Sequence, residues 1–306
     1  MVHATRLIRY AAAARFAIVF SMSSVRRFKD AIMSKYALFL AVMFFSLVGE
    51  LHAAAPWVAR HGLTATQYQQ TFDEMAKQGY RLIDVSGYAA GNEARYAAIW
   101  EKSAGPAWMA RHGLSSAQYQ QAFDDMAKQG YRLVRVSGYE VGGQDHYAAI
   151  WQKSGGPAWV ARHGLSSAQY QQAFDDMARQ GYRLVHVNGY TAGGQDRYAA
   201  IWEKSAGPAW VARHGLSSAQ YQQAFDDMAK QGYRLIDVSG YAAGNEARYA
   251  AIWEKSTGPV WMARHGLTAA QYQQTFNDLG KQGFRLVHVA GYSVGSQDLY
   301  AALWQK

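Results

Sequence analysis

Residues 57–64 read WVARHGLT, residues 67–72 read QYQQTF, residues 79–88 read GYRLIDVSGY and residues 96–102 read YAAIWEK. These phrases return four more times, with tryptophan at positions 57, 108, 159, 210 and 261, a constant spacing of 51 residues. The stretch 77–103 recurs letter for letter as 230–256, which indicates a recent internal duplication. A fixed period of this length is typical of a repeat architecture, in which each unit completes its core against its neighbours. Most of the 306 residues therefore form five copies of one unit, not two unrelated domains.

Each unit is predicted to contain one helix followed by a β-hairpin. Thr64 is the expected N-cap of the helix, and serine or threonine occupies the same place in every copy. Apolar residues follow from Tyr68 at helical spacing, and Gly79 ends the helix where a left-handed residue is favoured. Residues 80–86 and 95–100 then alternate as two strands around a glycine-containing turn.

The link from one hairpin to the next helix must run back along the whole unit. Residues 105–114 reach about 33 Å when extended at about 3.3 Å per residue, so we expect an extended segment. This segment could form a third strand of the unit or remain an extended linker. In the first strand, Ile83 and Val85 are expected to face the helix, whereas Leu82 and positions 84 and 86 are expected to face an inner, concave side.

The predicted fold class is α+β. Five tandem 51-residue repeats, each one helix plus a β-hairpin, are expected to form a curved antiparallel sheet, a half-barrel or a ring, with the helices on the outside. The predicted five-repeat domain covers residues 56–306, and its repeats are 56–105, 106–156, 157–207, 208–258 and 259–306.

Residues 1–55 differ in composition from the repeats. They carry seven basic and two acidic residues, and their apolar run at 36–48 is shorter than the roughly 20 residues of a bilayer span. A basic start, a short apolar run and an alanine-rich exit are typical of a secretory signal peptide, best matched if translation begins at Met33. We expect cleavage after Ala53 or Ala55, export to the periplasm or medium, and no stable membrane span afterwards.

Charge and composition exclude several classes of partner. The N-terminal segment supplies seven minus two, or +5, of the formal charge of +9, so the repeats carry 24 minus 20, or +4. This charge is spread evenly and offers no basic block for phosphates, so no nucleic acid partner is predicted. The absence of cysteine excludes disulfides, thiolate metal sites and a cysteine nucleophile. No cofactor is predicted.

The repeated phrases W-x-A-R-H-G-L-[ST]-x-x-Q-Y, G-Y-R-L-x-x-V-x-G-Y and Y-A-A-I-W resemble the bacterial tandem repeat domain. Similar repeats form the non-catalytic N-terminal part of secreted polyglycine hydrolases, whose other half is a β-lactamase-like serine hydrolase. The resemblance covers residues 56–306 and implies an exported protein with a half-barrel of sheet and helices. It implies no hydrolase chemistry here, because no serine is followed by lysine three positions later, as Ser-x-x-Lys requires.

The positions that differ between matching copies are the candidate binding residues. Position 84 of the repeat is occupied in turn by Asp84, Arg135, His186, Asp237 and His288, all expected on the concave face. The hairpin tips vary too, and their candidates are Arg95, His146, Arg197 and Arg248. Repeat proteins often fix the scaffold and vary the surface that meets a ligand, although neutral drift at solvated positions is an open alternative. Two histidines and an aspartate at position 84 could converge on a metal, but no local ligand spacing supports this, and no metal site is predicted.

Two other features have a structural and a functional interpretation. The triplet Arg60-His61-Gly62 is similar to the start of a histidine phosphatase motif, but leucine follows it, and we expect Arg60 to pair with Asp73 and His61 to bond backbone near the helix start. Tyr96 and Trp100 could form a stacking platform for sugars, but rings of this size also fill the core of a small unit, which is the favoured interpretation.

The sequence therefore predicts an exported, non-catalytic repeat protein that presents a concave aromatic and polar surface to a protein, peptide or glycan. The alternative is a hydrolase, or an accessory module of a serine hydrolase, with a site built from His, Asp and Arg of successive repeats.

Overall fold

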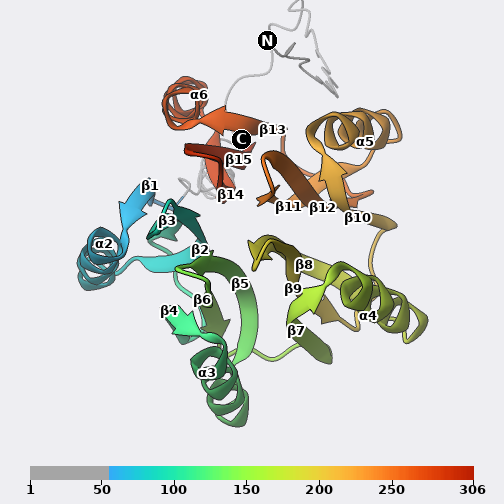
Figure 1. The fold of residues 1–306 in the computed structure, drawn as a ribbon, viewed down its shortest axis with the longest axis horizontal. Coiled ribbons are helices and arrows are strands. Elements are labelled where there is room, and N and C mark those ends of the chain that lie inside the picture. Colours follow the sequence, from blue (N-terminus) through green and yellow to red (C-terminus); the bar gives the residue numbers. More distant parts are fainter. Residues whose placement is uncertain (1–54) are drawn as a thin grey trace, which may run out of the picture. The chain divides into compact units, whose positions relative to one another are not determined.

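The computed structural model describes residues 55–306, and residues 56–306 form one compact unit. The predicted signal peptide and the start at Met33 lie outside the described residues. Each repeat contains a three-stranded antiparallel sheet and one helix, and the helices lie around the outside of the unit (Figure 1). The predicted fold class is confirmed, and the extended segment before each helix is a third strand.

The five helices begin at the predicted caps. They are α2 (Ala65–Lys77), α3 (Ser116–Lys128), α4 (Ser167–Arg179), α5 (Ser218–Lys230) and α6 (Ala269–Lys281). The Thr64 hydroxyl accepts the backbone N–H of Gln67, whose side chain accepts the N–H of Thr64 in return. At the other end Gly79 adopts a φ of +81°, and the Tyr80 N–H closes the helix on the Met75 carbonyl. No helix in the described part of the chain is long and apolar enough to cross a bilayer.

The three strands of each repeat have fixed places in the sheet. The outer strands are β1 (Trp57–Thr64), β4 (Trp108–Ser115), β7 (Trp159–Ser166), β10 (Trp210–Ser217) and β13 (Trp261–Thr268). The middle strands are β3 (Glu93–Glu101), β6 (Gln144–Gln152), β9 (Gln195–Glu203), β12 (Glu246–Glu254) and β15 (Gln297–Gln305). The inner strands are β2 (Arg81–Ala90), β5 (Arg132–Val141), β8 (Arg183–Ala192), β11 (Arg234–Ala243) and β14 (Arg285–Val294).

The five inner strands surround one axis and close a ring. Each inner strand lies beside the inner strand of the next repeat, and β14 of the last repeat lies beside β2 of the first (Figure 1). At this junction Arg285 forms an ion pair with Glu101, and the hydroxyls of Tyr88 and Tyr300 are 2.6 Å apart. Equivalent tyrosine pairs join the other repeats, as Tyr96 does with Tyr139 at 2.5 Å. The ring therefore closes by the same kind of contact that joins repeats adjacent in sequence.

A β-bulge in the inner strand corrects the predicted assignment of faces. The pairing of β2 with β3 shifts between Leu82 and Asp84, so Ile83 is the extra residue. Leu82 and Val85 therefore both lie in the core of their own repeat with the helix residue Tyr68. Ile83 points instead toward the core of the preceding repeat. The prediction that Leu82 faces the concave side was wrong, because the bulge interrupts simple alternation.

The hydrophobic cores are shared between neighbours. The core under α2 contains Tyr68 and Trp100 from the first repeat, and it is completed by Tyr139 and Ile150 from the second. Tyr96 and Trp100 are at most 1% exposed, so these rings are core residues and not a platform for sugars. Since every core needs the next repeat, a single unit would leave large aromatic surfaces in water.

One glycine in each inner strand admits a ring from the next repeat. A Cβ built on Gly87 would lie 2.4 Å from Cε1 of Tyr139, and the four equivalent glycines meet the next tyrosine in the same way. The pair Gly-Tyr therefore recurs in every copy because the glycine of one repeat and the tyrosine of the next fit together.

Gly87→Ala is expected to lower the free energy of unfolding by about 1–3 kcal/mol, since the added methyl group overpacks a buried junction. The matched control is Gly280→Ala in α6, where a Cβ meets nothing within 4 Å and the other four repeats already have alanine. That change should raise the free energy of unfolding by up to about 1 kcal/mol. Urea denaturation of both variants measures the difference, and equal stability of Gly87→Ala and the unmodified protein would contradict the packing described.

Candidate functional site

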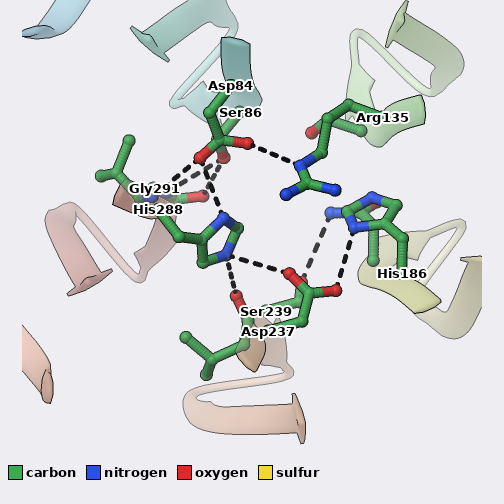
Figure 2. Close-up of polar contacts among 12 residues, drawn as sticks. Asp84, Ser86, Arg135, His186, Asp237, Ser239, His288 and Gly291 are labelled. Atoms are coloured by element: carbon green, nitrogen blue, oxygen red, sulfur yellow. Dashed lines mark hydrogen bonds and ion pairs between the residues drawn. The ribbon is translucent and has the colours of Figure 1, made fainter. Parts of the chain in front are cut away.

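The residues at position 84 of the repeats meet on the ring axis. We call this group the axial cluster, and it consists of Asp84, Arg135, His186, Asp237 and His288. Figure 2 shows the five side chains pointing toward one another from five different inner strands. The sequence placed all five on one face of the inner strands, and the closed ring brings them together on its axis. The sequence did not predict their burial: four are at most 6% exposed, and only Arg135 is partly open to solvent. The expected solvated concave face is thus a buried polar layer.

Each acidic member of the axial cluster has a basic neighbour. Asp84 Oδ1 lies 3.3 Å from Arg135 Nε, and Asp84 Oδ2 lies 2.9 Å from His288 Nδ1. Asp237 Oδ2 lies 2.9 Å from His186 Nδ1, and Asp237 Oδ1 lies 3.4 Å from His288 Nε2. The buried charges are therefore compensated within the layer, as burial requires. Within residues 55–306 these groups do not form a set of ligands for a metal ion.

The same side chains also replace missing strand pairing between repeats. Asp237 Oδ2 accepts the Val187 N–H at 2.8 Å, and Asp84 Oδ2 accepts the Val289 N–H at 2.9 Å. His288 Nε2 donates to the Val238 carbonyl at 2.7 Å. An inner strand is hydrogen-bonded along one edge to the middle strand, so its other edge must find partners elsewhere. The axial cluster supplies them.

The pKa values follow from this arrangement. Burial alone would raise the pKa of Asp84, but the charges of His288 and Arg135 and the hydrogen bond from Val289 outweigh it and hold the pKa below its usual range. Asp237 is shifted the same way, since the charge of His186 and its hydrogen bond overcome burial. Burial disfavours the charged form of His288, yet Asp84 and Asp237 raise the pKa of His288 to about 9.

A layer of hydroxyl groups lies next to the axial cluster. The Ser137 hydroxyl accepts the Gly87 N–H at 3.0 Å and donates to the Gly87 carbonyl at 3.2 Å. Ser239 bonds Gly189 in the same way, at 3.0 and 3.2 Å. Position 86 therefore serves four of the five junctions, with Asn188 in place of serine at one of them, whereas Ala290 has no polar side chain for the fifth.

Beyond this layer the ring opens into a depression of about 340 Å³ at the end where the hairpin tips lie. We call it the axial depression. Each inner strand contributes one residue to its wall, three positions before the hairpin tip. These wall residues are Ala89, Glu140, Thr191, Ala242 and Ser293. These side chains differ between repeats and are half-buried. These residues were not among the predicted site residues, although their variation between repeats is a signal in the sequence that could have found them.

The predicted hairpin-tip residues lie outside the lining of the axial depression. Arg95 and Arg248 each form an ion pair with a glutamate of the same hairpin, Glu93 and Glu246. His146 stacks on Tyr139 with 5.8 Å between ring centroids. Arg197 lies opposite Tyr190 in its hairpin.

The Arg-His-Gly triplet has a packing role. His112 meets the edges of Tyr68 and Tyr96 of the preceding repeat, at 4.7 and 5.2 Å between centroids. The expected pair of Arg60 with Asp73 is not the observed contact. Arg60 donates to the Ala59 carbonyl, and Asp73 accepts from a glutamine on its own helix. The histidine therefore fastens one repeat to the previous one.

These features define a closed ring of tandem structural repeats. A family model described as "Polyglycine hydrolase-like, structural repeat" matches the chain five times, at residues 54–103, 105–154, 156–205, 207–256 and 258–306. The chain belongs to this repeat family, which confirms the resemblance found in the repeated residues.

The raised pKa of His288 predicts a pH dependence of stability. A base whose folded pKa is about 9 stabilises the fold fully below its ordinary value of 6.5, and this contribution is lost as the pH rises toward 9. The free energy of unfolding should fall by up to about 1.4 kcal/mol per pH unit in this window. Burial lowers the pKa of His112, which meets the edges of two tyrosines, so its effect lies below pH 6.5.

His288→Gln should remove most of this slope in urea denaturation curves measured from pH 6 to 9. His146→Gln, outside the axial cluster, is the matched control and should retain it. A slope unchanged in His288→Gln would show that His288 is not held charged by its two carboxylates.

Proposed function

We propose that this chain is a non-catalytic binding module whose ligand occupies the axial depression. The observation that carries the proposal is the position of the depression: it lies on the ring axis, where all five repeats contribute wall residues, and where those residues vary while the scaffold around them is constant. A site on the axis can contact one ligand with a side chain from each of the five repeats at once.

Burial argues for binding over hydrolysis. The candidate acid and base groups of the axial cluster are engaged with one another and with backbone, so an attacking group would first have to leave a buried pair. The alternative of a hydrolytic site at position 84 therefore has less support. The family description names the repeat as structural, which agrees with a supporting or binding role.

Ala89→Phe tests the place of binding, because Ala89 lines the depression and a phenyl group would fill part of it. A thermal-shift screen of soluble glycans and peptides supplies the ligands, and titration calorimetry measures their affinity for each variant. We expect at least tenfold weaker binding in Ala89→Phe. Ala104→Phe makes the same change at an exposed position just after β3, at the opposite end of the sheet, and should bind normally. Equal binding by both variants would place the ligand elsewhere.

We further propose that the module is exported after removal of its N-terminal segment. The support is the sequence pattern alone: basic residues, the apolar run 36–48 and the small residues before Pro56. Mass spectrometry of the protein from its native host should find a mature N-terminus just after Ala53 or Ala55. A cell-associated protein that retains residues 33–53 would contradict this proposal.

A further inference from the structure

The hydroxyl layer shows which chemical group suits the free edge of an inner strand. A single serine hydroxyl satisfies both the N–H and the C=O of one residue, as Ser137 does for Gly87. The closing junction uses the same arrangement, with the Ser86 hydroxyl 3.0 Å from the Gly291 nitrogen and 3.4 Å from its carbonyl oxygen (Figure 2). A hydroxyl can do this because it donates one hydrogen bond and accepts others.

Two residues further along each inner strand, the same edge meets the axial depression. Alternate residues of an antiparallel strand point their N–H and C=O groups to the same side, so those of Ala89 face the same way as those of Gly87. The hydroxyl layer lies between the axial cluster and the axial depression, and the residues that form the wall of the depression come next along each inner strand. One edge carbonyl already has a hydroxyl partner, since the Thr191 side chain donates to the Ala242 carbonyl. This hydroxyl belongs to the preceding repeat, not to the following one as in the layer of serines, but it shows that a hydroxyl can bond an edge carbonyl at the level of the depression.

The charges of the lining favour a neutral ligand. Glu140 is the one residue with a formal charge among those that line the depression, and its carboxylate accepts the Gly193 N–H of the next repeat. An anionic ligand would find no cationic side chain there, and a cation would find a carboxylate that is already engaged. Hydrogen bonding, not ion pairing, must supply the specificity.

The arrangement of the strand edges also favours a saccharide over a peptide as the ligand. An extended peptide pairs with one strand edge along its length. Here five short edges reach the same level around one axis, and a linear chain can follow only one of them. A sugar ring carries hydroxyls around its circumference and can meet several edges together. The volume of about 340 Å³ lies at the small end of ligand sites, which suits one or two sugar rings.

We propose that the axial depression binds a neutral, hydroxyl-rich ligand, a short saccharide, whose hydroxyls bond the free edges of the inner strands as Ser86, Ser137 and Ser239 do one layer below. This inference rests on the proposed function, because it assumes that the depression is the binding site. It adds the chemical class of the ligand and the groups of the protein that recognise it.

The test titrates the five-repeat protein with the neutral disaccharides cellobiose, maltose and N,N′-diacetylchitobiose, and follows backbone amide signals by NMR. We expect at least one sugar to shift the amides of Ala89, Glu140, Thr191, Ala242 and Ser293. The amides of Gly87, Gly189 and Gly291, two residues earlier, are internal controls and should move less, because serine hydroxyls already accept from them. Ala89→Phe should abolish the shifts, and Ala104→Phe should leave them.

A chemical control isolates the role of the hydroxyl groups. The fully O-methylated form of the same disaccharide keeps its oxygen acceptors but has lost its donors, so it should bind at least tenfold more weakly. Equal binding of the methylated sugar would overturn the proposal. So would unperturbed amides at tens of millimolar of all three sugars. If a peptide binds instead and Ala89→Phe blocks it, the saccharide class fails while the proposed function stands; if sugars shift amides outside the depression only, both fail.

Discussion

The structure depends on the free edge of the inner strands. Each inner strand forms a ladder with its middle strand, and the five sheets remain separate, so a full row of N–H and C=O groups faces the neighbouring repeat. A buried backbone group without a partner costs about 1–3 kcal/mol. The chain resolves this with side chains from the next repeat, each position serving four of the five junctions: carboxylates and imidazoles at position 84, and hydroxyl or amide groups at position 86. The residues that hide the edges therefore also help to join the repeats.

This constraint explains why polar residues vary where the scaffold is constant. A carboxylate accepts from an N–H of the preceding strand, whereas an imidazole donates to a carbonyl, so Asp and His both serve position 84. An acidic residue then lies beside a basic one at four junctions. A ring of five cannot alternate two kinds of residue all the way round, and the junction left over brings Arg135 next to His186. Arg135 is also the partly exposed member, turned toward Asp84 and its own Val134 carbonyl.

Much of the fold followed from the repeated sequence, because periodicity, caps and turns are local signals. Thr64, Gly79 and the hairpin strands lie where the sequence placed them, and the repeat period put the variable residues of position 84 at equivalent places in every inner strand. The faces of the inner strand did not follow, since the bulge at Ile83 depends on packing against a neighbouring repeat. Closure of the ring also could not be deduced from the sequence, because the rotation from one repeat to the next depends on how residues such as Tyr139 pack against Gly87 of the neighbouring repeat. The burial of the axial cluster is a consequence of that closure.

Closure of the ring requires one particular number of repeats. An open solenoid gains or loses a unit and simply becomes longer or shorter, and only its two end caps must be kept. Here the first and last repeats are each other's caps, joined by Arg285, Glu101 and the tyrosine pair. Unequal recombination between the identical stretches 77–103 and 230–256 would delete three whole units without disturbing the sequence of any survivor. The remaining pair could not meet around an axis. Duplication and deletion change the number of repeats, whereas closure of the ring requires a fixed number. A chain with a different number of repeats cannot close the ring, even though the sequence of each repeat is intact.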